Sequence, residues 1–287
     1  MKTRIAQVVA LLTVMAAAAA ALPINRATAD VQTWIRPKDG AVMVSVPAGS
    51  FTMGDDNGDD DAKPAHQVTL DGYWIDKNLV TVAMYQKFCT ATGRKMPPEP
   101  NGHLPDGTPY QWGWADHQDH PIVNVTWDDA KAYADWAGAQ LPTEAQWEKA
   151  ARGTDGRTYP WGNDWDTGKL WSSVDGQKHG TAPVGTFPEG ASPYGALDMA
   201  GNVWEWCADY YGKDYYKNSP AQNPTGPRYS ETRVLRGGSW LNYFEYYFRC
   251  SNRINNDPSY RNNINGFRCV VRADSSLERA PESGSSR

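Results

Sequence analysis

The chain has 287 residues, a formal net charge of −5 and 40% hydrophobic residues. This apolar content can fill a core, so the composition excludes a globally disordered protein. The negative charge argues against a nucleic-acid-binding protein, which needs a basic surface. Tryptophan (13) and tyrosine (15) far outnumber phenylalanine (6). This bias favours a fold held by side-chain hydrogen bonds, or an aromatic binding surface.

Residues 1–29 have the pattern of a secretory signal peptide. Lys2 and Arg4 precede a long apolar run, and residues 27–29 (ATA) supply a small-residue cleavage site. The alternative is a membrane anchor, but the run is rich in alanine and ends at Pro23. We therefore expect an exported protein, periplasmic or secreted, that uses the general secretion route and keeps no membrane span after cleavage.

The first half of the mature chain shows short periodic segments. Alternating apolar residues predict strands over residues 42–51 and 67–76. Apolar residues at helical spacing predict a helix over residues 80–92, which Gly93 can end. A long loop is expected over residues 93–120, since this stretch is rich in proline, glycine and histidine.

The second half begins with helical patterns and then loses them. We expect a helix over residues 127–138 and another from about residue 142, where Thr143 and Gln146 have the spacing of a capping box. The remainder is predicted to be irregular, with short strands over residues 234–240 and 266–271. The sequence thus predicts one α+β domain over residues 30–272, loop-rich with low regular secondary structure, and a flexible tail over 273–287.

Export would make the four cysteines informative. Cys89, Cys207, Cys250 and Cys269 are even in number, and an oxidising compartment allows two disulfides in any of three pairings. A zinc site is less favoured, because no Cys-x₂-Cys pair exists and the five histidines are scattered.

Four ordered motifs resemble the formylglycine-generating enzyme family, also called sulfatase-modifying factors. They are residues 46–54 (VPAGSFTMG), 141–148 (LPTEAQWE), 201–206 (GNVWEW) and 236–240 (RGGSW), with 265–269 (NGFRC) closing the series. The resemblance runs from about residue 42 to residue 271. It implies a fold related to C-type lectins, with few regular elements and bound Ca²⁺.

The copper chemistry of the family does not carry over. The family enzymes oxidise a substrate cysteine to formylglycine with O₂, and they hold Cu(I) on two thiolates shortly after the Gly-Gly-Ser motif. Asn242 and Glu245 fall nearest to these thiolates here, and neither is a comparable Cu(I) ligand. Cys250 matches a disulfide cysteine of the family instead. Copper is therefore not expected in this chain.

The resemblance still implies a site after the Gly-Gly-Ser motif. Glu245 is a candidate general acid or base, provided that burial raises its pKa. The alternatives are that Ser239 caps a turn, that Trp206 belongs to the core and that Glu245 is solvated. The implied catalytic residues are Ser239, Trp206, Asn242 and Glu245.

A substrate groove is implied beside these residues. A ring of tyrosines would line it, and two arginines would either clamp an anionic substrate or pair with buried acids. The groove residues are Tyr243, Tyr246, Tyr247, Arg253 and Arg268.

Calcium is the implied cofactor. Asn202 and Glu205 would supply side-chain oxygens, and the carbonyls of Ala200, Gly201 and Val203 would complete the cage. The alternative is that the two side chains bond only to protein groups in a buried loop.

The family disulfides must also have changed. The partners of the cysteines at positions like Cys250 and Cys269 correspond to Ala134 and Ala150 here. The resemblance therefore implies Cys89–Cys269 together with Cys207–Cys250, and Cys250–Cys269 is an alternative.

Two functions are compatible with these features. The first is an exported maturation enzyme or factor that acts on a secreted peptide or a siderophore-like small molecule. Exported family members without the copper cysteines are linked to pyoverdine maturation, where the dihydro-chromophore is oxidised. The second is a non-catalytic, lectin-like module that binds peptide or glycan.

Overall fold

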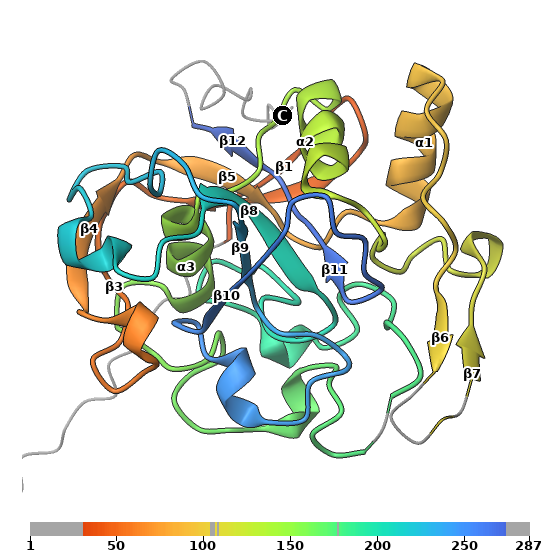
Figure 1. Cartoon of the computed structure of the whole chain (residues 1–287). Helices are drawn as coiled ribbons and strands as arrows, with labels where there is room; N and C mark the ends of the chain where they lie inside the picture. The colour runs from red at the N-terminus through yellow and green to blue at the C-terminus, as the bar shows by residue number, and fades with distance from the viewer. Residues whose placement is uncertain (1–30, 104–106, 108, 177, 274–287) are drawn as a thin grey trace, which may run out of the picture. The chain divides into compact units, whose positions relative to one another are not determined.

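The computed structural model describes residues 31–103, 107, 109–176 and 178–273 (Figure 1). The predicted signal peptide and nearly all of the predicted tail lie outside the described residues. Within the described part of the chain, none of the helices combines the length and apolar character needed to cross a membrane.

Two four-stranded sheets form the framework of the described residues (Figure 1). The first sheet has the order β1-β2-β5-β12 and is antiparallel throughout, so strands from both ends of the domain share it. Its strands are β1 (Thr33–Ile35), β2 (Val42–Val46), β5 (Tyr73–Asp76) and β12 (Val270–Arg272).

The second sheet has the order β10-β9-β8-β11, and its β8–β11 pair is parallel. Its strands are β8 (Trp204–Tyr210), β9 (Arg233–Arg236), β10 (Arg253–Asn256) and β11 (Asn265–Gly266). Two-stranded sheets are formed by β3 (Gly49–Met53) with β4 (His66–Leu70), and by β6 (Asn101–His103) with β7 (Pro109–Gln111).

Threonines begin the three α-helices. Thr126 and Thr143 both form complete capping boxes, which confirms the predicted start at Thr143. Gly93, with φ of 72°, ends the first helix as predicted. The helices are α1 (Val82–Thr92), α2 (Trp127–Trp136) and α3 (Glu144–Arg152).

The predicted strands 42–51 and 67–76 are each two strands. Pro47 interrupts the first because it has no N–H for a ladder hydrogen bond, and Gly72 lies in the break of the second. The predicted long loop contains the β6–β7 hairpin. Elsewhere the low regularity is confirmed, and short 3₁₀ turns occupy Asp60–Ala62, Trp114–Asp116, Thr167–Lys169, Pro188–Gly190, Tyr215–Asn218 and Glu245–Phe248.

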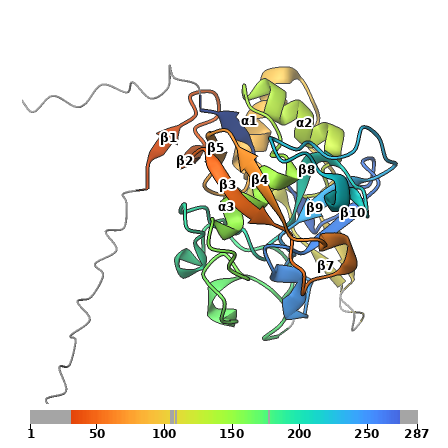
Figure 2. The ribbon, with the colours of Figure 1, turned by 90° about the vertical axis from the view of Figure 1, so that its left-hand side faces the viewer.

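Helix α3 packs against both β3–β4 and the second sheet (Figure 2). Two glutamates of α3, Glu144 and Glu148, are buried in the core. Arg236 forms salt bridges with both, at 2.8 Å and 2.7 Å respectively. Buried charges of this kind are tolerated when they are paired and hydrogen-bonded. The largest fully buried side chains include four tryptophans, namely Trp147, Trp204, Trp206 and Trp240. These side chains account for part of the tryptophan surplus.

Candidate functional site

Two glycines turn the chain away from β9 and begin the predicted site. Gly237 and Gly238 have φ values of 97° and 77°, which side-chain-bearing residues rarely adopt. A Cβ at Gly238 would lie 2.5 Å from Cδ1 of Phe248. Glycine here therefore allows residues 239–248 to fold back onto the end of the strand.

Ser239 and Asn242 are brought together by this turn. The Asn242 Oδ1 accepts the Ser239 hydroxyl at 2.8 Å and the Ser239 N–H at 2.9 Å. Ser239 is fully buried. Ser239 therefore lies in a hydrogen-bonded turn, as the structural alternative expected. The carbonyl of Asn242 in turn accepts the N–H of Ser173 at 3.0 Å, which fixes this segment against residues 171–178.

The other two predicted catalytic side chains lie elsewhere. Trp206 is fully buried and its Nε1 donates to the carbonyl of Val125 at 3.2 Å, so it is a core residue. Glu245 opens a 3₁₀ turn with an exposed side chain. Because the side chain is exposed, the alternative of a solvated carboxylate holds.

The tyrosines that were predicted to line the groove lie close together, at the protein surface. Tyr243 is 60% exposed, Phe244 50% and Tyr246 38%. Tyr246 and Tyr247 have ring centroids 4.2 Å apart, and Tyr247 meets the buried Trp204 edge-on at 6.0 Å. Their hydrogen bond raises the pKa of Tyr246 to about 12. We call residues 243–247 the aromatic segment.

The two predicted substrate clamps are structural. Arg253 bonds both oxygens of Glu144, at 2.7 and 2.6 Å. Arg268 bonds both oxygens of Glu205, at 2.6 and 2.9 Å. All four residues are buried. Neither arginine is free to bind an anionic substrate, so the alternative of buried acid pairing is correct.

The predicted calcium loop has a different side-chain arrangement from the expected one. Both amide atoms of Asn202 are bonded to the backbone of Ala182, each at 3.1 Å. Asp198, which the sequence analysis did not single out, lies buried in the same loop, and burial raises its pKa to about 6, with Glu205 adding to the rise. Glu205 is paired with Arg268, whereas Asp198 accepts the N–H of Gly185 at 2.7 Å and forms no salt bridge among the described residues. Each carboxylate oxygen has a second lone pair.

This charge balance fits a hard cation. Asp198 and Glu205 would supply the side-chain oxygens, with carbonyls of Ala200, Gly201 and Val203 as predicted. Asn202 does not fit as a side-chain ligand. Calcium itself stays a prediction.

The cysteines are all unpaired in the structure. Cys89, Cys207, Cys250 and Cys269 are free thiols, and each is buried. The Cys89 Sγ contacts the carbonyl of Lys95 at 3.6 Å. Neither implied disulfide arrangement is formed here. None of the four lies within residues 239–248, so this segment offers no thiolate to Cu(I).

A cavity of about 240 Å³ adjoins the predicted site and was missed from the sequence. Trp112, which lines it, has its ring 6.2 Å from that of Trp240, the residue after Ser239. The hydroxyl of Ser173 donates to the carbonyl of Trp240 at 2.8 Å. We call this space the histidine cavity. Its lining is Gln111, Trp112, His117, Trp171, His179, Gly180 and Thr181.

Three of the five histidines lie at or beside this cavity: His117 and His179 line it, and His120 packs against His117. His117 and His120 meet edge-on, with ring centroids 4.5 Å apart. The Nδ1 of His120 lies 2.9 Å from the Thr181 hydroxyl. Burial lowers the pKa of His120, and His117 lowers it further. The His-x₂-His spacing beside Trp112 was the available sequence signal.

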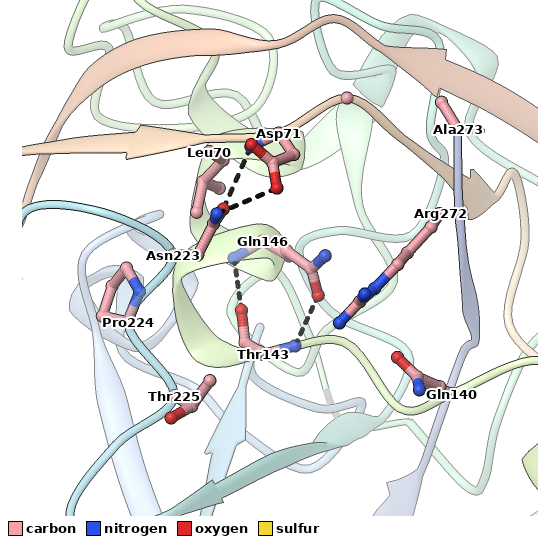
Figure 3. A pocket seen from close by; sticks show the side chains of 11 residues that line it. Leu70, Asp71, Gln140, Thr143, Gln146, Asn223, Pro224, Thr225, Arg272 and Ala273 are labelled. Atoms are coloured by element: carbon pink, nitrogen blue, oxygen red, sulfur yellow. Dashed lines mark hydrogen bonds between the residues drawn. The ribbon is translucent and has the colours of Figure 1, made fainter. Parts of the chain in front are cut away.

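A second groove of about 330 Å³ lies between β12 and the start of α3 (Figure 3). Its polar groups largely satisfy one another. Asp71 and Asn223 exchange two hydrogen bonds, and Thr143 and Gln146 exchange the two of the capping box (Figure 3). No residue predicted for the functional site lines it.

Comparison with known proteins identifies the class. The model of the sulfatase-modifying factor enzyme 1-like domain matches residues 30–273. The chain therefore belongs to the sulfatase-modifying factor family.

Individual relatives are similar over most of their length. The formylglycine-generating enzyme of Streptomyces coelicolor is 37% identical, covering 89% of this chain and 97% of that protein. The mouse formylglycine-generating enzyme is 33% identical, covering 82% and 76%. Among solved structures, PvdO from Pseudomonas aeruginosa is 30% identical, covers 84% of this chain and 98% of that chain, and has a TM-score of 0.70. The expected family and fold class are confirmed.

Proposed function

We propose that this protein is an exported maturation enzyme of the sulfatase-modifying factor family that does not use copper thiolates. Its substrate would be a siderophore precursor of the dihydropyoverdine type. The observation that carries this proposal is the combination of a thiolate-free segment after Ser239 with an aromatic and histidine-lined cavity beside it. The likeness to PvdO over 84% of the chain supports it.

The histidine cavity suits a flat aromatic ring. Trp112 and Trp171 contribute aromatic rings to its lining, and His117 and Thr181 offer polar groups that fix orientation. The reaction removes two hydrogens from the dihydro-chromophore. Dioxygen is the electron acceptor we propose, taking two electrons and two protons to give hydrogen peroxide. Ser239 and Asn242 hold the wall of the site in place rather than react.

Purified protein and dihydropyoverdine test this proposal. We expect oxygen-dependent formation of the fluorescent chromophore and one equivalent of peroxide per product. Trp112→Ala should reduce the rate at least tenfold, whereas Trp34→Ala, a change in β1 away from the cavity lining, should not. Unchanged rates with and without protein would contradict the proposal. Export is tested separately, by locating a tagged full-length chain in cell fractions.

The second candidate is a binding module without catalysis. The exposed rings of Tyr243, Phe244 and Tyr246 favour it, because such rings stack on sugars and peptide side chains. Here we expect saturable binding to a glycan or peptide array that the double change Tyr243→Ala, Phe244→Ala removes. Loss of binding with unchanged chromophore oxidation would separate the two functions.

A further inference from the structure

The position of one proton on His117 follows from its partner. The Nδ1 of His117 lies 3.0 Å from the carbonyl oxygen of Gly113. A carbonyl oxygen has no hydrogen to give, so Nδ1 carries the proton. In the neutral ring the lone pair is therefore on Nε2. No hydrogen bond to Nε2 occurs among the described residues.

The surroundings of this nitrogen suit a phenol. His117 lines the histidine cavity together with Trp112, whose ring centroid is 6.0 Å from the imidazole. A phenol that entered this cavity would lie among the side chains of Trp112, Trp171 and His117. A basic nitrogen in such a cavity is the partner of an acidic O–H group.

Several charged and titratable groups surround His117. His120 packs against it, and burial lowers the pKa of His120. The charge of Asp119 acts on His120 in the opposite direction. His179 lines the same cavity. The Lys178 ammonium lies 4.6 Å from the centroid of the Trp171 ring and is paired with Asp175 at 3.1 Å, so Asp175 balances its charge.

We propose that His117 is the general base that accepts the proton of a phenol or catechol hydroxyl bound in the histidine cavity. The O–H bond breaks, an N–H bond forms at Nε2, and the electron pair stays on the oxygen as a phenolate. The Gly113 carbonyl stabilises the resulting imidazolium through Nδ1–H. No electrons leave the ligand in this step, so it needs no oxidant. The inference rests on the proposed function for its place in a reaction, because phenolates are oxidised more readily than phenols.

The test uses 4-nitrocatechol, whose phenolate absorbs at longer wavelength than its neutral form. Bound to the wild-type protein, the probe should ionise with an apparent pKa about one unit lower than in His117→Gln, roughly a tenfold change in the anion-to-neutral ratio. His103→Gln, an exposed histidine outside the cavity, should behave as wild type. Imidazole added to His117→Ala should restore part of the shift. Equal ionisation in wild type and His117→Gln would overturn the inference, as would failure of the probe to bind wild type.

A measurement on the wild-type protein alone covers the case in which the variants fail to fold. Calorimetry in two buffers with different ionisation enthalpies counts the protons released on binding. Transfer to His117 predicts that binding of the neutral probe releases no net proton, since the imidazole keeps the proton that the hydroxyl loses. Release of one proton per bound anion would contradict it. If proton transfer occurs but dihydropyoverdine is not oxidised, the proposed function fails and this inference stands.

Discussion

The Glu205 carboxylate and the Arg268 guanidinium form a fully buried two-point ion pair, with N–O distances of 2.6 and 2.9 Å. Glu205 lies on β8 of the second sheet, whereas Arg268 lies between β11 and β12. Arg268 also donates to the carbonyls of Asp76, Lys77 and Leu197. One arginine thus connects the segment between β11 and β12 to β5 in the first sheet, to Leu197 in the loop before β8, and to β8 itself.

Removing one member of this pair should be costly. We expect Glu205→Gln to lower the free energy of unfolding by about 3–5 kcal/mol, because it leaves a buried guanidinium without its counter-charge. Urea denaturation measures it. The double change Glu205→Gln, Arg268→Met should cost less than the two single changes added together. Simple additivity would contradict the pairing.

Gly238→Ala should be destabilising for two reasons. The backbone has φ of 77°, which costs about 1 kcal/mol for alanine. The added Cβ would also lie 2.5 Å from the Phe248 ring, and overpacking costs about 1–3 kcal/mol more. Gly93→Ala is the matched control, since its φ is 72° but nothing lies within 4 Å of its Cβ. Equal losses for both in urea denaturation would rule out the contact with Phe248.

Asn242 and Glu245 occupy the positions closest to the family's copper cysteines, and we expect them to behave differently. Asn242→Ala removes the acceptor for the buried Ser239 hydroxyl and N–H, so we expect a loss of about 1–3 kcal/mol in the free energy of unfolding. Glu245→Gln changes an exposed carboxylate and should alter stability by less than about 0.5 kcal/mol. It should also leave chromophore oxidation within about twofold. A large rate loss would restore Glu245 as a general acid or base.

Asp209 should make stability fall as pH rises. Burial, with the charge of Glu144 adding to it, raises its pKa to about 8 from 3.8. Between those values the folded state binds more protons than the unfolded state, so the free energy of unfolding decreases with rising pH. We expect Asp209→Asn to remove about 1–4 kcal/mol of the loss measured between pH 5 and pH 8. Asp116→Asn, on the surface, is the control. Parallel pH profiles for wild type and Asp209→Asn would contradict this.

Calcium should stabilise the protein if the predicted cage forms. Glu205 is paired with Arg268, whereas the buried Asp198 carboxylate forms no salt bridge among the described residues, and a bound cation would balance its charge. We expect millimolar CaCl₂ to raise the Tm above its value in EDTA, following binding linkage. Asp198→Asn should abolish the difference, whereas Asp56→Asn in an exposed loop should not. An identical Tm in CaCl₂ and EDTA for wild type would exclude the site.

Much of the local structure was predictable because it depends on neighbours in sequence. Thr143 with Gln146 marked a helix start, and Gly93 marked a helix end. Apolar alternation located the strands but not the break at Pro47, which splits one predicted strand into β2 and β3 in different sheets. The ordered motifs also indicated the family and its loop-rich fold.

The contacts that the predicted site residues make could not be predicted from neighbouring residues in the same way. The sequence left open whether Arg253 and Arg268 clamp a substrate or pair with buried acids, and only the fold places Glu144 and Glu205 against them. Trp206 and Tyr246 both belong to sequence segments that were predicted to line the site. Trp206 is buried in the core, whereas Tyr246 is exposed.

What the sequence alone determined is therefore the class of protein, the absence of cysteines from the copper segment and the ends of the helices. These are properties of composition and of residues a few positions apart. Only the tertiary structure decided which polar groups were already satisfied and which faced a cavity. His117, Trp171 and His179 are separated by up to 62 positions, and chain folding brings them to one cavity wall. Desolvation and pairing depend on contacts of this kind, which no local pattern encodes.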